Sequence, residues 1–98
     1  MEITIKHETN LIVELDGRLD TSTSIILENK MKEENISEDL VILDFTKLEY
    51  ISSAGLRVLL AIKKNLDANN KKLEIHNINA VVKEVFNVTG FKNILNIK

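Results

Sequence analysis

Hydrophobic and polar residues alternate with a period of two in several short segments of the chain. Near the amino end this alternation covers Ile3–Ile5 and Leu11–Leu15. It predicts two half-exposed antiparallel strands joined by a turn at Glu8–Asn10. The same period at Lys72–His76 predicts a further strand, and the apolar pattern of Ile94–Ile97 indicates a last, short one.

The continuous apolar run Leu40–Leu43 shows no alternation, as expected for a central strand covered on both faces or nearly so. Three other segments have the apolar spacing and composition of helices: Thr21–Asn35, Ala54–Ala68 and Ala80–Thr89. Gly90 directly follows the third segment, and we expect it to end that helix as a left-handed cap.

Strands and helices are therefore predicted in the order strand, strand, helix, strand, helix, strand, helix, strand. Helices that alternate with buried strands act as right-handed crossovers, so this order predicts an α/β domain. The 98 residues, of which 44% are hydrophobic, fit one compact domain over residues 1–98. Proline is absent and no linker or repeat interrupts the chain, so no internal boundary is expected.

Charge and composition exclude several classes of function. The net charge is −2 without a basic block, which argues against sequence-independent binding of nucleic acid. Cysteine is absent and the two histidines, His7 and His76, lie far apart, so no metal site is expected. The amino end lacks a basic segment followed by an apolar one, and no apolar run approaches the ~20 residues that span a bilayer. We therefore expect a cytoplasmic protein that does not bind membranes.

Ser52 and Ser53 lie just beyond a predicted strand, at the start of the central helix. A serine at this place can cap the helix, bind an anion or accept a phosphate, because the first turn offers free N–H groups and a partial positive charge. One serine is expected to cap while the other points outward. The small residues Ala54 and Gly55 that follow leave space around the second hydroxyl.

Enzymatic roles for these residues find little support. A nucleophilic Ser53 needs a general base, for which His76 is the only candidate, and no glycine precedes the serine as in the Gly-x-Ser-x-Gly elbow. Asp20 and Asp44 are candidates for paired carboxylates. Each stands close to a hydroxyl residue, however, and can equally cap a helix or close a turn. The glycine patterns of phosphate-binding and dinucleotide-binding loops are absent.

Three segments, Leu15–Asp20, Leu43–Arg57 and Val85–Phe91, together resemble a STAS domain of the bacterial anti-sigma factor antagonist type, and the resemblance covers essentially the whole chain. It implies helices packed on a small mixed β-sheet and no enzyme activity or cofactor. In this family an antagonist binds an anti-sigma factor that is also a serine kinase, and so frees a sigma factor. Phosphorylation of one serine ends that binding, and a PP2C-type phosphatase restores it.

Aligned on Gly55 and Leu56, the resemblance makes Ser53 the phosphoacceptor. Ser52 stands where the family usually has aspartate, and Ala54 replaces a second hydroxyl residue. The implied surface for the partner consists of Asp20, Thr21, Ser52, Ala54, Gly55, Leu56 and Arg57. A monomer or weak dimer is expected.

Two other functions remain open from the sequence. The first is a STAS module that is not phosphorylated and serves as a scaffold or as an accessory subunit of a larger complex, such as a lipid transporter. The replacement of the usual aspartate by Ser52 favours this reading. The second is an enzyme that uses Ser53, whose activity would be lost on Ser53→Ala.

Overall fold

The computed structural model describes all residues from Met1 to Lys98. Strands and helices alternate in the predicted order, with one short 3₁₀ turn added near the end. The elements are β1 (Glu2–His7), β2 (Leu11–Leu19), α1 (Thr21–Glu33), β3 (Leu40–Ile51), α2 (Ser53–Ala68), β4 (Lys72–His76), α3 (Ala80–Thr89), the 3₁₀ turn (Phe91–Asn93) and β5 (Asn96–Ile97).

The five strands form one mixed sheet in the order β1-β2-β3-β4-β5. The pair β1 and β2 is antiparallel, with Ile5 opposite Val13, as the alternation near the amino end predicts. All other neighbouring strands are parallel. The prediction of an α/β domain with helical crossovers between parallel strands is therefore confirmed.

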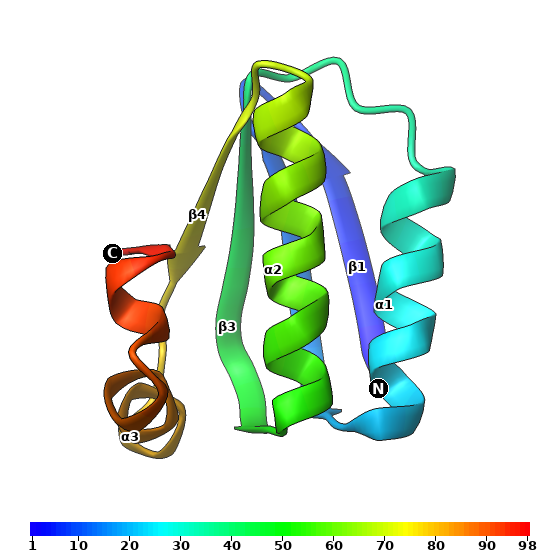
Figure 1. Ribbon diagram of the computed structural model, residues 1–98. Helices are drawn as coiled ribbons and strands as arrows, with labels where there is room; N and C mark the ends of the chain where they lie inside the picture. Colours follow the sequence, from blue (N-terminus) through cyan, green and yellow to red (C-terminus); the bar gives the residue numbers. More distant parts are fainter.

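Helices α1 and α2 lie side by side over one face of the sheet (Figure 1). On β3, Val41 and Leu43 point to this face and are fully buried, whereas Leu40 and Ile42 are only half-buried. The prediction that Leu40–Leu43 is covered on both faces or nearly so is thus wrong for the face of Leu40 and Ile42. An unbroken apolar run marks a central strand, but here the alternate side chains line an uncovered sheet face.

Helix α3 lies beside the sheet near the lower end of β3 (Figure 1). Its Phe86 is fully buried and packs on Phe45, with ring centroids 6.5 Å apart and a tilt of 37°. Gly90 adopts φ 77°, the left-handed conformation predicted for it, and its N–H donates to the carbonyl of Asn87. Helix α3 therefore ends at Gly90 because glycine adopts the left-handed backbone conformation without a steric penalty.

Two strands are longer than the apolar patterns at their starts indicate. Strand β2 continues past Leu15 to Leu19 through a register shift at Gly17, and β3 continues past Phe45 to Ile51. Each of these two strands leads almost directly into a helix. None of the helices is both long and apolar enough to pass through a membrane.

Candidate functional site

Two helix N-termini lie next to each other at one edge of the sheet. Leu19, the last residue of β2, is the register partner of Ile51, the last residue of β3. The Ser52 N–H donates to the carbonyl of Leu19 at 2.9 Å. As a result Asp20 and Ser52, each of which caps the helix that follows, are neighbours in space.

At the start of α2 the two serines have different roles. The Ser52 Oγ accepts a hydrogen bond from the Gly55 N–H at 3.2 Å, and the first helical bond joins the Leu56 N–H to the Ser52 carbonyl at 3.0 Å. Ser53 is exposed and occupies the first helical position. One serine therefore caps while the other faces outward, as predicted. The N–H groups of Ser53 and Ala54, ahead of the first helical bond, are oriented to meet an anion.

At the start of α1 the cap is Asp20. Its Oδ1 accepts from the N–H groups of Ser22 and Thr23, both at 3.1 Å, while the Asp20 N–H donates to Thr23 Oγ1 at 2.8 Å. The Asp20 carboxylate also accepts bonds from the Ser22 and Thr23 hydroxyls. The bond from the Thr23 N–H first, and then these hydroxyl bonds, hold the pKa of Asp20 below its usual range. Asp20 thus places a fixed negative charge beside the start of α2, with Thr21 exposed next to it.

Gly55 and Leu56 are buried, with Leu56 only 4% exposed. A Cβ on Gly55 would lie 2.8 Å from Ile51 Cγ1 and 2.9 Å from both Cγ and the carbonyl oxygen of Leu19. Gly55 therefore permits close packing of α2 on the ends of β2 and β3. The resemblance places Gly55 and Leu56 in the surface for the partner, but in this structure the first turn of α2 turns both toward the core.

The exposed surface beside Ser53 includes Arg57, which the sequence singled out, and the pair Arg18 and Tyr50, which it did not. Arg57 is exposed one helical turn after Ser53. On the open face of the sheet, the Arg18 guanidinium carbon lies 4.5 Å from the centre of the Tyr50 ring, and these two residues are register partners. No period-two pattern in the sequence marks this pair, because the buried residues Phe45, Leu48 and Ile51 of β3 are three apart and the pairing of β2 with β3 contains two register shifts.

Neither histidine lies near Ser53. His76 pairs with Asp44, seven residues before Ile51 on β3, which places it roughly 20 Å away along the strand at about 3.3 Å per residue. His7 lies beside Leu11, at the far end of β2. Ser53 therefore has no imidazole base within reach.

Asp44 has a structural role away from Asp20. It accepts bonds from the Thr46 N–H at 3.0 Å, the Thr46 hydroxyl at 2.6 Å and the Asn77 side-chain amide at 3.0 Å. Burial would raise the pKa of Asp44, but the bonds from Asn77 and Thr46 outweigh it, and the pKa is lowered. The structure does not bring the two candidate carboxylates together, and no group of side chains suited to hold a metal ion is present.

Comparison with known proteins places this arrangement in a family. The model of the family described as STAS domain matches residues 2–98. BtrV of Bordetella bronchiseptica, which is named as an anti-sigma factor antagonist, is 35% identical over 96 residues, covering 96% of this chain and 83% of that protein.

Solved structures share the fold. An anti-sigma factor antagonist from Mycobacterium paratuberculosis superposes with a TM-score of 0.85 at 18% identity, covering 98% of this chain and 83% of the other. The Bacillus cell fate determinant SpoIIAA, in its phosphorylated form, superposes with a TM-score of 0.73 at 17% identity, covering 99% and 91%. The chain belongs to the STAS domain family, and relatives that it matches over almost its full length are named anti-sigma factor antagonists.

Proposed function

We propose that this chain is an anti-sigma factor antagonist of the bacterial cytoplasm whose binding to its partner is switched off by phosphorylation of Ser53. The partner is an anti-sigma factor with serine kinase activity, and its capture frees a sigma factor. A PP2C-type phosphatase restores binding. The observation that carries the proposal is that, at the start of α2, Ser52 caps the helix and leaves the hydroxyl of Ser53 exposed.

The surroundings of Ser53 suit a phosphate. A phosphoserine at the first helical position meets the positive end of the α2 dipole and the N–H groups of the first turn. Arg57, one turn later and exposed, is spaced to pair with the phosphate oxygens. The free antagonist therefore accommodates the modification without a change of fold.

The same phosphate weakens a complex formed over this surface. It adds ≈ −1.5 to −2 charges, which must be desolvated when a partner covers Ser53. Acidic residues of the partner that face Ser53 would add repulsion. If desolvation and repulsion together cost ~3 kcal/mol, the affinity for the partner falls more than a hundredfold.

The partner-binding surface that we propose consists of exposed or half-exposed residues around Ser53. Gly55 and Leu56 support it from below and do not contact the partner. Its members are Asp20, Thr21, Ser52, Ser53, Ala54 and Arg57.

The serine at position 52 is compatible with this role. The family's usual aspartate and a serine are both good N-caps, and Ser52 accepts the Gly55 N–H in that way. Ser52 lacks the negative charge of that aspartate, but Asp20, which caps the adjacent helix, places a negative charge close by.

Binding variants expressed in the native cells test the proposal. Affinity-tagged wild-type protein, Ser53→Ala and Ser53→Asp are purified, and the proteins that accompany them are quantified by mass spectrometry. We expect an anti-sigma factor kinase to accompany Ser53→Ala at least as strongly as the wild type, and Ser53→Asp much less. Thr9→Asp serves as the matched control, because Thr9 is an exposed residue in the turn before β2 and its charge should leave binding unchanged.

Equal recovery of the kinase with Ser53→Asp and Ser53→Ala would count against the switch while leaving the antagonist role in place. Recovery of transporter subunits, with no kinase in any sample, would favour the scaffold function. Ser52 in place of the usual aspartate is the observation that keeps this second function in view.

A further inference from the structure

His7, the last residue of β1, is held between two carboxylates of the connection from α1 to β3. Its Nδ1 lies 2.7 Å from Oε2 of Glu38, and its Nε2 lies 2.5 Å from Oε1 of Glu34. Ionised carboxylates only accept hydrogen bonds, so both ring nitrogens must carry a proton to form both bonds. The ring in this arrangement is therefore the imidazolium cation.

Glu38 depends on this cation. Its side chain is 8% exposed, and Oε1 is buried without a hydrogen-bond partner. A buried carboxylate with one unsatisfied oxygen is costly unless a charge compensates it. Loss of the proton on His7 would remove the positive charge that compensates Glu38. Movement of the Glu38 carboxylate into water would then lower the free energy of the connection.

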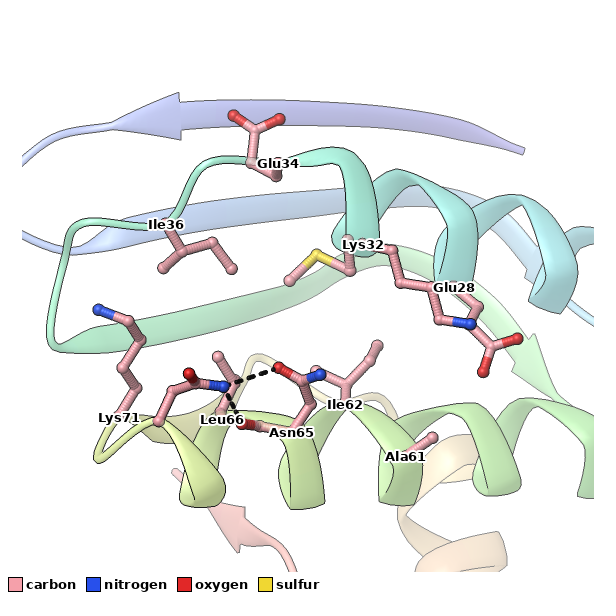
Figure 2. Close-up of a pocket in the computed structure, with 11 residues that line it drawn as sticks. Glu28, Lys32, Glu34, Ile36, Ala61, Ile62, Asn65, Leu66 and Lys71 are labelled. Carbon is pink, nitrogen blue, oxygen red and sulfur yellow. Dashed lines mark hydrogen bonds between the residues drawn. The ribbon is translucent and has the colours of Figure 1, made fainter.

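The segment that His7 holds forms one side of a groove. The groove has a volume of about 290 Å³ and lies between the C-terminal halves of α1 and α2. Figure 2 shows Ile36 over the groove, while the carboxylate of Glu34 points away from it toward β1. On the other side of the connection, Lys71 Nζ donates to the Glu38 carbonyl at 2.8 Å.

We propose that His7, Glu34 and Glu38 form a proton-controlled clamp that holds residues 34–38 against β1 and thereby fixes one wall of the groove between α1 and α2. This device is independent of Ser53, which lies at the opposite end of the sheet. It makes the position of this wall depend on pH.

The charges around the ring give the sign of the effect. Glu34 and Glu38 face the imidazole from the connection, β2 contributes the apolar Leu11, and Lys71 approaches only the Glu38 backbone. Hydrogen bonds from Glu34 and then Glu38 raise the pKa of His7. A raised pKa in the folded state means that the clamp is complete below the ordinary histidine value of about 6.5 and is lost as pH rises through the raised value.

Acid opens the clamp from the other side. Burial would raise the pKa of Glu38, but its own backbone N–H and His7 outweigh burial and lower it. This contribution is present above the ordinary glutamate value and is lost as pH falls through the lowered one. The clamp is therefore closed over a window of pH bounded by Glu38 below and His7 above.

NMR of the whole chain tests the clamp. The ¹⁵N shifts of the His7 ring report its protonation. Hydrogen exchange reports the protection factors of the hydrogen-bonded amides of the segment as the pH is raised: the Glu34 amide, which donates to the Lys30 carbonyl, and the Ser37 and Glu38 amides, which donate to the Glu38 carboxylate. We expect these protection factors to fall several-fold as His7 loses its proton, while those of α2 stay constant. The variant His7→Gln should remove the pH dependence, and His76→Gln, which changes the other histidine, should keep it.

Two results would overturn the proposal. One is unchanged protection of residues 34–38 in the wild type on both sides of the His7 titration. The other is a His7 ring with one unprotonated nitrogen at neutral pH. Neither result depends on a variant, and neither bears on Ser53, so the function proposed above would stand.

Discussion

At the scale of single residues, the start of α2 separates two tasks between adjacent serines. Ser52 satisfies the Gly55 N–H, and Ser53 makes no capping bond and is exposed. Capping and modification therefore need not compete for one hydroxyl. A phosphate on Ser53 leaves the cap of α2 in place.

This separation predicts different stabilities for two alanine variants. Ser52→Ala removes the cap and should lower the free energy of unfolding by about 1 kcal/mol. Ser53→Ala removes an exposed hydroxyl and should change it by less than about 0.5 kcal/mol. Urea unfolding of both variants beside the wild type measures the difference. A larger loss for Ser53→Ala than for Ser52→Ala would contradict the assignment of the cap.

Gly55 gives a second prediction at this scale. The Cβ of Gly55→Ala would meet Ile51 and Leu19 at 2.8–2.9 Å, so the helix must shift from the strand ends, at a cost of about 1–3 kcal/mol. Ala61→Ser is a matched control, because it also adds one atom to α2 but at an exposed position, and should change stability by less than about 0.5 kcal/mol. Equal stabilities of the two variants in thermal or urea unfolding would show that Gly55 is not needed for the close packing of α2 on the strand ends.

At the scale of elements, β2 with α1 and β3 with α2 form two similar strand-to-helix junctions. Each strand ends at one member of the register pair Leu19 and Ile51, and each helix then begins with a capping side chain. The parallel pairing of β2 and β3 brings both junctions to the same edge of the sheet. This is why residues 20 and 52, far apart in sequence, belong to one site.

The cap of α1 predicts a dependence of stability on acid pH. The pKa of Asp20 is lowered in the folded state, so its contribution is present above the unfolded value of about 3.9 and is lost as pH falls through the lowered value. Asp20→Asn keeps an oxygen acceptor without the charge. Urea unfolding as a function of pH should show a shallower decline below about pH 4 for Asp20→Asn than for the wild type. Identical slopes would show that Asp20 does not contribute this charge.

The attachment of α3 predicts a large effect at one position. Phe86 is fully buried against Phe45, and Phe86→Ala should cost about 3–5 kcal/mol. Val88 on the same helix is 73% exposed, so Val88→Ala should cost less than about 0.5 kcal/mol. Denaturant midpoints test both, and a small loss for Phe86→Ala would mean that α3 is not held by this contact.

The sequence predicts the strands and helices better than it predicts which of their side chains are buried. The period of two identifies β1, β2 and β4, an unbroken apolar run identifies β3, and apolar spacing with composition identifies the helices, because each pattern reflects backbone geometry within a short segment. The half-exposed state of Ile42 could not be predicted, since it depends on which face the crossover helices cover. Burial of Leu56 likewise depends on the direction in which α2 leaves β3, which no local pattern specifies.

At the scale of the whole molecule, α1 and α2 share one face of the sheet, and their N-termini meet at one edge (Figure 1). The surface proposed for the partner lies at this edge, and the His7 clamp lies at the opposite end of the sheet. One hydrophobic core of 21 buried residues connects the two ends. The modification that we propose for Ser53 would therefore act on a partner directly, through charge at the contact, without a rearrangement of the fold.

The phosphorylation state of Ser53 in the native cells tests the central claim most directly. The protein is isolated under growth and stress conditions, and its intact mass and peptides are analysed with and without phosphatase treatment. We expect a phosphate-sized mass increment on the peptide that contains Ser53, removed by the phosphatase and absent from Ser53→Ala. A Ser53 that stays unmodified under every condition would contradict the proposed switch.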